Sequence, residues 1–253
     1  MKPIEVFYHV FIPKDERASM WTWWIDQQLG LIKSSKLADI ATVNIAVTAP
    51  KFWEAINGIT FRENGTKNDG WNFGQKIQEY ISTRYPFVNI LDIRDISANN
   101  YEGNTLKLLY DRCQIVDADI LYIHSKGVIS ASPSVAAWRE ILNHYCINEW
   151  PRCIKMLETS DVVGIKDLKS QDFTVSGNFW WSKSSHIRTL YDPLDTSRYV
   201  EDPMLHPGAP AYRYGFEYWI LHNQPTVNYI IDTETDHFDR YCFLEDLLKK
   251  DIK

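Results

Sequence analysis

Apolar residues along the chain follow two spacings, one typical of buried strands and one of amphipathic helices. Short runs rich in β-branched and aromatic residues predict strands at 4–11, 41–49, 87–95, 118–124 and 161–166. Apolar residues at helical spacing predict helices at 21–37, 70–86, 105–116 and 136–158. Because strand and helix alternate over the first two-thirds of the chain, we expect an α/β fold with a single mixed, mostly parallel sheet flanked by helices.

Local signals refine this organisation. Pro86 ends the second predicted helix, and Pro151 breaks or kinks the fourth. The apolar run at 87–95 predicts a buried third strand, and 173–190 predicts a strand that runs into a helix. Because no repeat or low-complexity linker interrupts the sequence, we expect a single domain over 1–253.

Composition and charge narrow the class of protein. The chain has 253 residues, of which 45% are hydrophobic and 24% charged, as in ordinary globular proteins. Aromatic residues make up 14%, which suits core packing and also sites that stack on sugars. The net charge of -6 argues against a nucleic acid as partner.

The sequence also bears on location. The first residues carry a charge at Glu5 and no long apolar core, which predicts neither a signal peptide nor a membrane span. The four cysteines, Cys113, Cys146, Cys153 and Cys242, form no CxxC pair. Without an export signal they indicate reduced thiols in a cytoplasmic protein.

A polar cluster, His124-Ser125-Lys126-Gly127, ends the fourth predicted strand. Ligands of such sheets bind beyond the carboxyl ends of the strands, so we expect a binding site there. A lysine ammonium can hold a phosphate, or it can extend into solvent. For His124, a role as donor or metal ligand and a purely structural hydrogen bond both stay open.

A literal Asp-x-Asp, Asp117 and Asp119, precedes the same strand instead of following it. It is therefore expected at the opposite edge of the sheet, in a turn or cap. Carboxylate ligands of a metal must converge on an open site, which this position does not favour.

An ordered set of features resembles the nucleotide-sugar half of GT-A glycosyltransferases. The set is an Asn-rich loop, a helix, an Asp-rich turn and the strand "ADILYIHSKG". In that family such a strand ends in an Asp-x-Asp motif that binds a divalent metal at the sugar-nucleotide diphosphate, whereas here His124 and Lys126 occupy those two positions. "SGNFWW" and "FEYWIL" are similar to acceptor-side elements of small GT-A enzymes, including bacterial and viral ones with a His-Ser/Thr-Lys-Gly turn.

The resemblance spans about residues 4–223 and implies one GT-A-like domain. It implies a nucleotide-sugar half at about 1–127, and an acceptor half with the C-terminal tail at about 128–253. The implied activity is transfer of a sugar from a nucleotide-sugar donor to a hydroxyl of a glycan or lipid-linked acceptor. A protein without a membrane-spanning segment can still reach a lipid-linked acceptor through peripheral contact with the membrane. Lys126 would replace the metal wholly or in part, and bound Mn²⁺ or Mg²⁺ is the open alternative.

The strand ends, the start of the helix after the Asn-rich loop, the polar and aromatic mix at "SGNFWW" and the resemblance together indicate two groups of site residues. On the nucleotide-sugar side these are His9, Val10, Phe11, Asp92, Arg94, Asn104, His124, Ser125 and Lys126. On the acceptor or sugar side they are Ser176, Gly177, Asn178 and Trp180. Arg139, just after the polar turn, is within reach of a phosphate or lies on a helix surface.

Several of these residues have structural alternatives. His9 suits a core strand equally well, and Arg94 between two acids suits a surface ion pair. Asn104 and Thr105 suit capping of the following helix. Neighbours on a strand point to opposite faces, so one of the adjacent tryptophans at 180 and 181 is expected in the core.

Glu217 lies among aromatic residues, where desolvation raises a carboxyl pKa toward the range of a general base. The resemblance places an acidic residue of this region in that role, which favours inverting transfer, and an ion pair with Arg213 is the alternative. His237 is either a metal ligand or a surface histidine. Two other functions stay open: a non-catalytic nucleotide- or sugar-binding protein, and a nucleotidyltransferase, which would need converging carboxylates.

Overall fold

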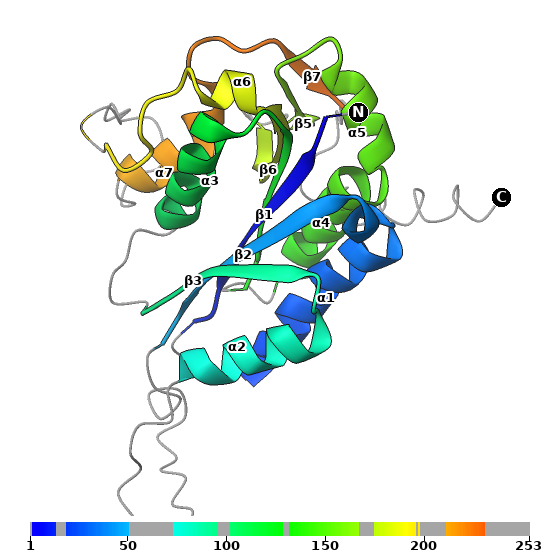
Figure 1. Ribbon diagram of the computed structural model, residues 1–253, viewed down its shortest axis with the longest axis vertical. Coiled ribbons are helices and arrows are strands. Elements are labelled where there is room, and N and C mark those ends of the chain that lie inside the picture. Colours follow the sequence, from blue (N-terminus) through cyan, green and yellow to red (C-terminus); the bar gives the residue numbers. More distant parts are fainter. Residues whose placement is uncertain are drawn as a thin grey trace, which may run out of the picture.

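The computed structural model describes residues 2–13, 19–50, 73–95, 102–128, 132–166, 175–195, 197 and 211–230. These residues form a seven-stranded sheet in the order β3-β2-β1-β4-β6-β5-β7, with helices on both faces (Figure 1). The strands are β1 (Ile4–Phe11), β2 (Ala41–Ala49), β3 (Val88–Asp95), β4 (Asp119–His124), β5 (Val162–Lys166), β6 (Val175–Lys183) and β7 (Val227–Tyr229). The helices are α1 (Trp21–Ser34), α2 (Phe73–Arg84), α3 (Gly103–Ile115), α4 (Pro133–Asn143), α5 (Trp150–Leu157), α6 (Ser184–Ile187) and α7 (Ala211–Tyr218).

Strand direction follows the expected α/β pattern with one exception. β1 pairs in parallel with β2 and β4, β2 with β3, and β5 with β7. β6 runs antiparallel to both of its neighbours, β4 and β5. The predicted class, a mixed and mostly parallel sheet flanked by helices, is confirmed.

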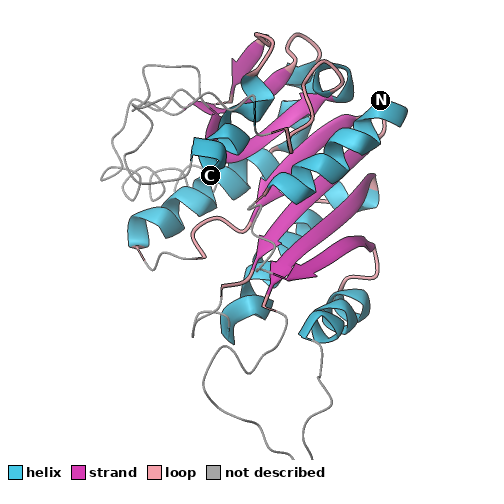
Figure 2. Ribbon diagram, turned by 90° about the vertical axis from the view of Figure 1, so that its left-hand side faces the viewer, coloured by secondary structure: helices cyan, strands magenta, loops and turns pink. Residues whose placement is uncertain are grey.

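Alternation along β1 explains how the two helical layers are held. Val6, Tyr8 and Val10 pack into the core beneath α1 and α2, whereas Phe7 packs into a second core beneath α3 and α7. Both faces of the sheet are therefore covered, as Figure 2 shows, and central strands of this kind are apolar on both sides. No helix of the described ranges is long and apolar enough to cross a membrane.

The structure differs from the expected burial of the third strand and has the expected break in the fourth helix. The prediction that the third strand is buried is wrong: β3 is the edge strand, its residues are mostly half-exposed, and Leu91 is 42% exposed. An apolar run cannot distinguish an edge from a central strand, because the neighbours are chosen by the fold. The predicted break near Pro151 is confirmed, since α4 passes into a π-helical turn at His144–Asn148 and Pro151 lies in the first turn of α5.

The Asp-x-Asp lies at the amino end of β4, as expected. Asp119 is level with Ile4 at the start of β1, and Asp117 accepts hydrogen bonds from Lys2 (3.1 Å) and Ser184 (3.2 Å). Asp117 and Asp119 are thus at the edge of the sheet opposite to the polar turn. The cysteines at 113, 146 and 153 are buried free thiols, and the one at 242 lies outside the described residues.

One buried ion pair ties β1 to α3. Glu5 is 3% exposed, and Arg112 donates to its carboxylate from Nε at 3.0 Å and from Nη2 at 2.8 Å. We expect Arg112→Met to lower the free energy of unfolding by about 2–3 kcal/mol, because it leaves a buried carboxylate unpaired. Urea denaturation measures this change.

Lys107→Met is the matched control on the same helix. Lys107 pairs with Asp111, whose side chain is 55% exposed, and exposed pairs of this kind contribute about 0–1 kcal/mol. Equal losses in the two variants would show that burial of Glu5 does not govern the strength of its pair.

Candidate functional site

The polar turn after β4 is bound directly to the end of β1. The backbone N–H of Ser125 donates to the carbonyl of His9 at 2.9 Å, and the Ser125 hydroxyl accepts from the N–H of Phe11 at 2.8 Å. Ser125 is buried, so its side chain serves this junction. The carboxyl ends of β1 and β4 are therefore locked together, with His124 and Lys126 half-exposed beside them.

The start of β6 meets the same turn. Because β6 is antiparallel, its first residues lie at the carboxyl end of β4. His124 Nε2 donates to the carbonyl of Gly177 at 2.7 Å, and Trp138 Nε1 donates to Ser176 Oγ at 2.9 Å. Gly177 and Asn178 have φ of +66° and +54°, a left-handed conformation that glycine and asparagine tolerate best. The turn and this segment thus form one hydrogen-bonded unit.

Two cations lie against tryptophan rings at the turn. Lys126 Nζ is 4.3 Å from the centre of the Trp138 ring, so the ammonium does not simply extend into solvent. Arg139 is 5% exposed, donates to the Lys126 carbonyl at 3.0 Å, and lies 5.1 and 4.9 Å from the rings of Trp23 and Trp24. Burial lowers the pKa of Arg139, but the group stays cationic at neutral pH.

Glu102, at the start of α3, was not expected among the site residues. Its Oε2 accepts hydrogen bonds from Tyr122 Oη (2.8 Å) and Asn178 Nδ2 (2.6 Å). The other end of the Asn178 amide accepts from Trp180 Nε1 at 2.8 Å. One carboxylate therefore joins α3, β4 and β6. The available sequence signal was an acid at a predicted helix start, where negative charge is favourable.

His9 lies directly beneath the same helix start. It is 3% exposed, and its Nδ1 is 2.8 Å from the hydroxyl of Thr105. Burial lowers the pKa of His9 to about 4, with Glu102 acting against the shift and His124 adding to it. His9 is therefore a neutral polar group at physiological pH.

The expected acceptor-side contacts need correction. Ser176 and Asn178 are 3% and 1% exposed, and their polar atoms are hydrogen-bonded within the protein. Trp180 is fully buried, with its ring 5.1 Å from that of Tyr122, and Trp181 is fully buried on the other face. Both tryptophans belong to the core because helices cover both faces of the sheet. These side chains support the site from beneath and present no surface to a ligand.

Two expectations on the nucleotide side also change. The Val10 side chain is fully buried in the core on the α1 face, so it cannot contact a base. Asn104 and Thr105 do not cap α3: the N-cap is Glu102, no side-chain cap bond forms, and both residues are buried in the first turn. A spacing pattern locates a helix start only to within a few residues.

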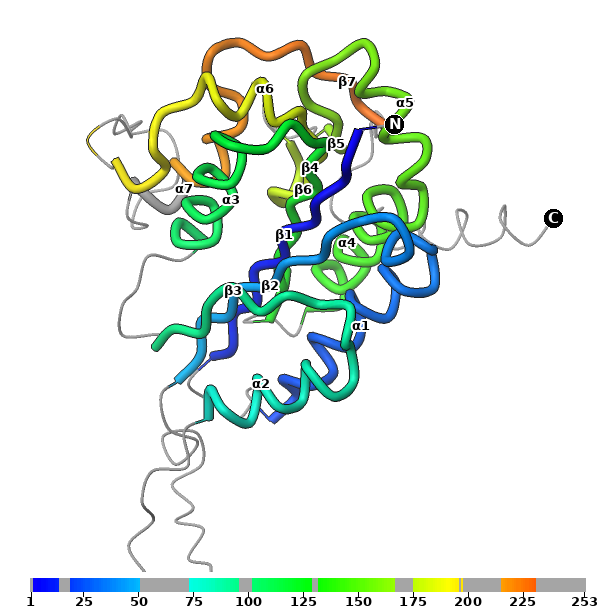
Figure 3. Tube along the Cα trace, in the orientation of Figure 1, coloured from blue at the N-terminus to red at the C-terminus, as the bar shows by residue number. Residues whose placement is uncertain are grey.

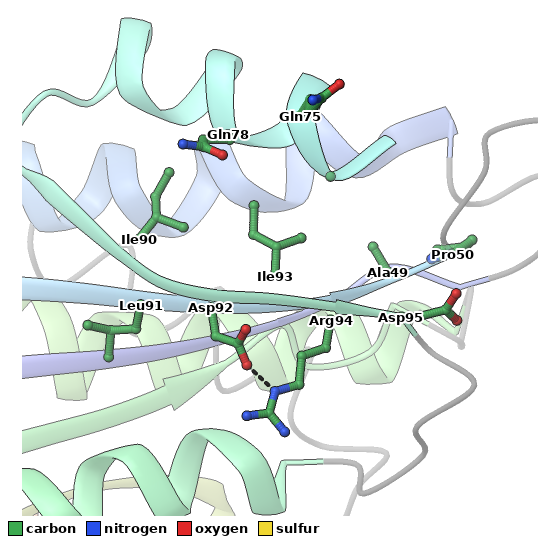
Figure 4. A pocket seen from close by; sticks show the side chains of 11 residues that line it. Ala49, Pro50, Gln75, Gln78, Ile90, Leu91, Asp92, Ile93, Arg94 and Asp95 are labelled. Carbon is green, nitrogen blue, oxygen red and sulfur yellow. Dashed lines mark hydrogen bonds and ion pairs between the residues drawn. The ribbon is translucent and has the colours of Figure 1, made fainter. Parts of the chain in front are cut away.

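Asp92 and Arg94 lie on the edge strand, two strands from β1. Phe11 on β1 is paired with Thr48 on β2, and Thr48 is paired with Arg94 on β3. Phe11 and Arg94 are therefore at the same edge of the sheet, with backbones about 10 Å apart. Arg94 Nε contacts Asp92 Oδ2, the surface pair given as an alternative (Figure 4). A cavity of about 680 Å³ adjoins them. It is lined by Ala49, Pro50, Gly74, Gln75, Gln78 and residues 90–95.

Glu217 belongs to α7, which packs beside α3 (Figure 3). The contact is close, since a Cβ on Gly103 would lie 2.5 Å from the Phe216 ring. Glu217 is half-buried. The pKa of the Tyr122 hydroxyl is raised well above its usual range. Burial is the main cause, and the nearby carboxylates of Glu102 and Glu217 add to it. Glu217 is thus within electrostatic reach of the site, while the side chain of Arg213 lies outside the described residues.

Few metal-ligating side chains gather at the turn among the described residues. No group of three or more His, Cys, Asp or Glu side chains among them could hold a metal ion. His124 Nε2 carries a proton, since it donates to a carbonyl, so only Nδ1 of this ring could bind a metal in that state. His237 lies outside the described residues.

Fold and site together define an α/β protein with one mixed sheet and a polar, cation-bearing turn at the carboxyl ends of its central strands. The family model described as a domain of unknown function (DUF8361) matches residues 7–228, and the chain belongs to this family. A comparison with curated proteins gives no match. A candidate nucleotide-diphospho-sugar transferase from Desulfovibrio desulfuricans G20 is similar in structure, with a TM-score of 0.43 and 9% identity over 99% of this chain and 98% of that one.

The low pKa of His9 predicts a specific dependence of stability on pH. An unfolded imidazole takes up a proton below pH 6.5 and the folded one only near pH 4, so the unfolded state binds more protons between these values. The free energy of unfolding should therefore fall by about 3 kcal/mol on this account as pH drops through that window. In His9→Gln this part of the fall should be absent, as denaturant unfolding at a series of pH values would measure. Parallel curves for the two proteins would contradict the assignment.

Proposed function

We propose that this chain is a glycosyltransferase that moves a sugar from a nucleotide-sugar donor to a hydroxyl of a glycan or lipid-linked acceptor. The observation that carries the proposal is the junction of the polar turn with the ends of β1 and β6. It brings two cations and several half-exposed polar groups to one edge of a mostly parallel sheet, where ligands of such sheets bind. The resemblance of the same turn to GT-A enzymes points to the same edge.

The cations suit the diphosphate of a donor. A departing nucleoside diphosphate needs positive charge, and Lys126 is held by Trp138 at the turn, where the resemblance implies a metal. Arg139 adds a second positive charge just beneath, bonded to the Lys126 carbonyl. Both charges are partly or fully removed from water, which strengthens their attraction for an anion. We therefore assign Lys126 the role of the metal, with Arg139 as a positioning residue.

The exposed groups around the polar turn are the candidates for contacts with the nucleobase and with the acceptor. Phe11 and His124 are half-exposed at the ends of β1 and β4, and Asp92 and Arg94 are accessible on β3. They support a nucleoside lying across the ends of β1 to β3. Glu217 is the candidate base for an inverting reaction, in which it would take the proton of the acceptor hydroxyl as the sugar carbon is attacked.

The alternatives are less well supported. A nucleotidyltransferase would use carboxylates that converge on metal ions, and the described residues contain no such group. A non-catalytic binding protein on this fold would share the turn and the cations. Turnover of a bound donor separates it from a transferase.

Titration calorimetry with nucleoside diphosphates and nucleotide sugars tests the proposal. We expect selective binding that persists in EDTA and is weakened about 10- to 100-fold in Lys126→Ala, since a charge-assisted contact is lost. Lys155→Ala, an exposed lysine on α5, is the control and should bind as the wild type does. Binding that requires Mn²⁺ or Mg²⁺ would refute replacement of the metal by Lys126. Absence of binding by every nucleotide would refute the transferase assignment.

A further inference from the structure

Glu102 is the one carboxylate that the described structure holds inside the site by two hydrogen bonds. Both bonds go to Oε2, from Tyr122 Oη at 2.8 Å and Asn178 Nδ2 at 2.6 Å. The residue is half-buried, so it is not sealed in the core. Within the described part of the chain, Oε1 accepts no hydrogen bond. The carboxylate is thus oriented by one oxygen and retains acceptor capacity on the other.

Two buried side chains, those of Tyr122 and Asn178, orient Glu102, whereas a helix cap requires neither of them. Asn178 has φ of +54° and is 1% exposed, and its amide bridges Glu102 to Trp180 Nε1. Tyr122 is fully buried and donates its hydroxyl to the same oxygen. Groups locked in this way hold a side chain in a single position, which is what a binding contact needs.

Charge along the site changes sign between the turn and this helix start. Lys126 and the buried Arg139 lie at the turn. Glu102 lies at the start of α3 beside His9. His9 is neutral because its pKa is low. No cation is hydrogen-bonded to Glu102 among the described residues. A phosphate would be attracted to the first end and repelled by the second, so the part of a donor beside Glu102 is not its diphosphate.

We propose that Glu102 binds a hydroxyl of the transferred sugar, and that the donor sugar is therefore neutral and hydroxylated, not a sugar acid. This inference rests on the proposed function, since it assigns the second half of the same ligand. A carboxylate accepts strong hydrogen bonds from hydroxyl groups. It also repels a sugar carboxylate at short range, which selects against uronic and sialic acids.

Calorimetry on wild type and Glu102→Gln tests the inference with UDP and GDP, a neutral sugar donor and a uronate donor of each, and CMP-sialic acid as a further acidic donor. The probes are UDP, UDP-glucose and UDP-glucuronate; GDP, GDP-mannose and GDP-mannuronate; and CMP-sialic acid. We expect Glu102→Gln to bind the neutral donor about 10-fold more weakly while the bare diphosphate binds unchanged. The preference of the wild type for the neutral sugar over the uronate should shrink in the variant.

Two further variants separate contact from support. Tyr122→Phe keeps the carboxylate but removes one bond that orients it, and should weaken the neutral donor only about threefold. Glu158→Gln makes the same change of charge at an exposed position after α5 and should change nothing. Thermal melting of each variant confirms that it is folded.

The outcomes are distinguishable. Equal weakening of diphosphate and donor in Glu102→Gln, or no weakening of either, would overturn the role of Glu102 and leave the transferase assignment standing. Binding of CMP-sialic acid or a uronate donor in preference to neutral sugars would overturn the substrate class. Failure of the wild type to bind any probe would remove the proposed function, and this inference with it.

Discussion

Strand β6 is antiparallel to β4, and this direction decides where polar residues from distant segments of the chain meet. Tyr122 is level with Trp180 across the pair, so the start of β6 comes to lie beyond the end of β4. His124 can then donate to the Gly177 carbonyl, and Trp138 to Ser176. Had β6 been parallel, its first residues would lie at the opposite edge, beside Asp119. The rest of the site is built on this meeting point.

Burial gives the site its distribution of charge. The guanidinium of Arg139 lies against the neighbouring rings of Trp23 and Trp24, and the ammonium of Lys126 lies against the ring of Trp138. His9, shielded by α3, is neutral at physiological pH. The carboxylate of Glu102 accepts its hydrogen bonds from two neutral groups, the Tyr122 hydroxyl and the Asn178 amide, and not from a cation. A single edge of the sheet thereby presents a positive and a negative region, an arrangement suited to a ligand with an anionic and a hydroxylated part.

The sequence predicted the regular elements well because their signals are local. The apolar runs located the central strands, and the breaks at Pro86 and Pro151 appear where the ring and missing N–H of proline require them. The polar turn was recognised for the same reason, as an abrupt change at the end of an apolar run. Glu102 was missed because an acid before a helix is common, and nothing local indicates that Tyr122 and Asn178 will reach it.

The sequence by itself thus determined the class of fold, the ends of the strands and the presence of a cationic turn. Each of these depends on residues within a few positions of one another. Only the tertiary structure decided that β3 is an edge strand, that Trp180 and Trp181 are both core, and that Glu102 is held within the site. Those outcomes depend on which faces are covered and which segments pair, and such long-range contacts leave no periodic signal along the chain.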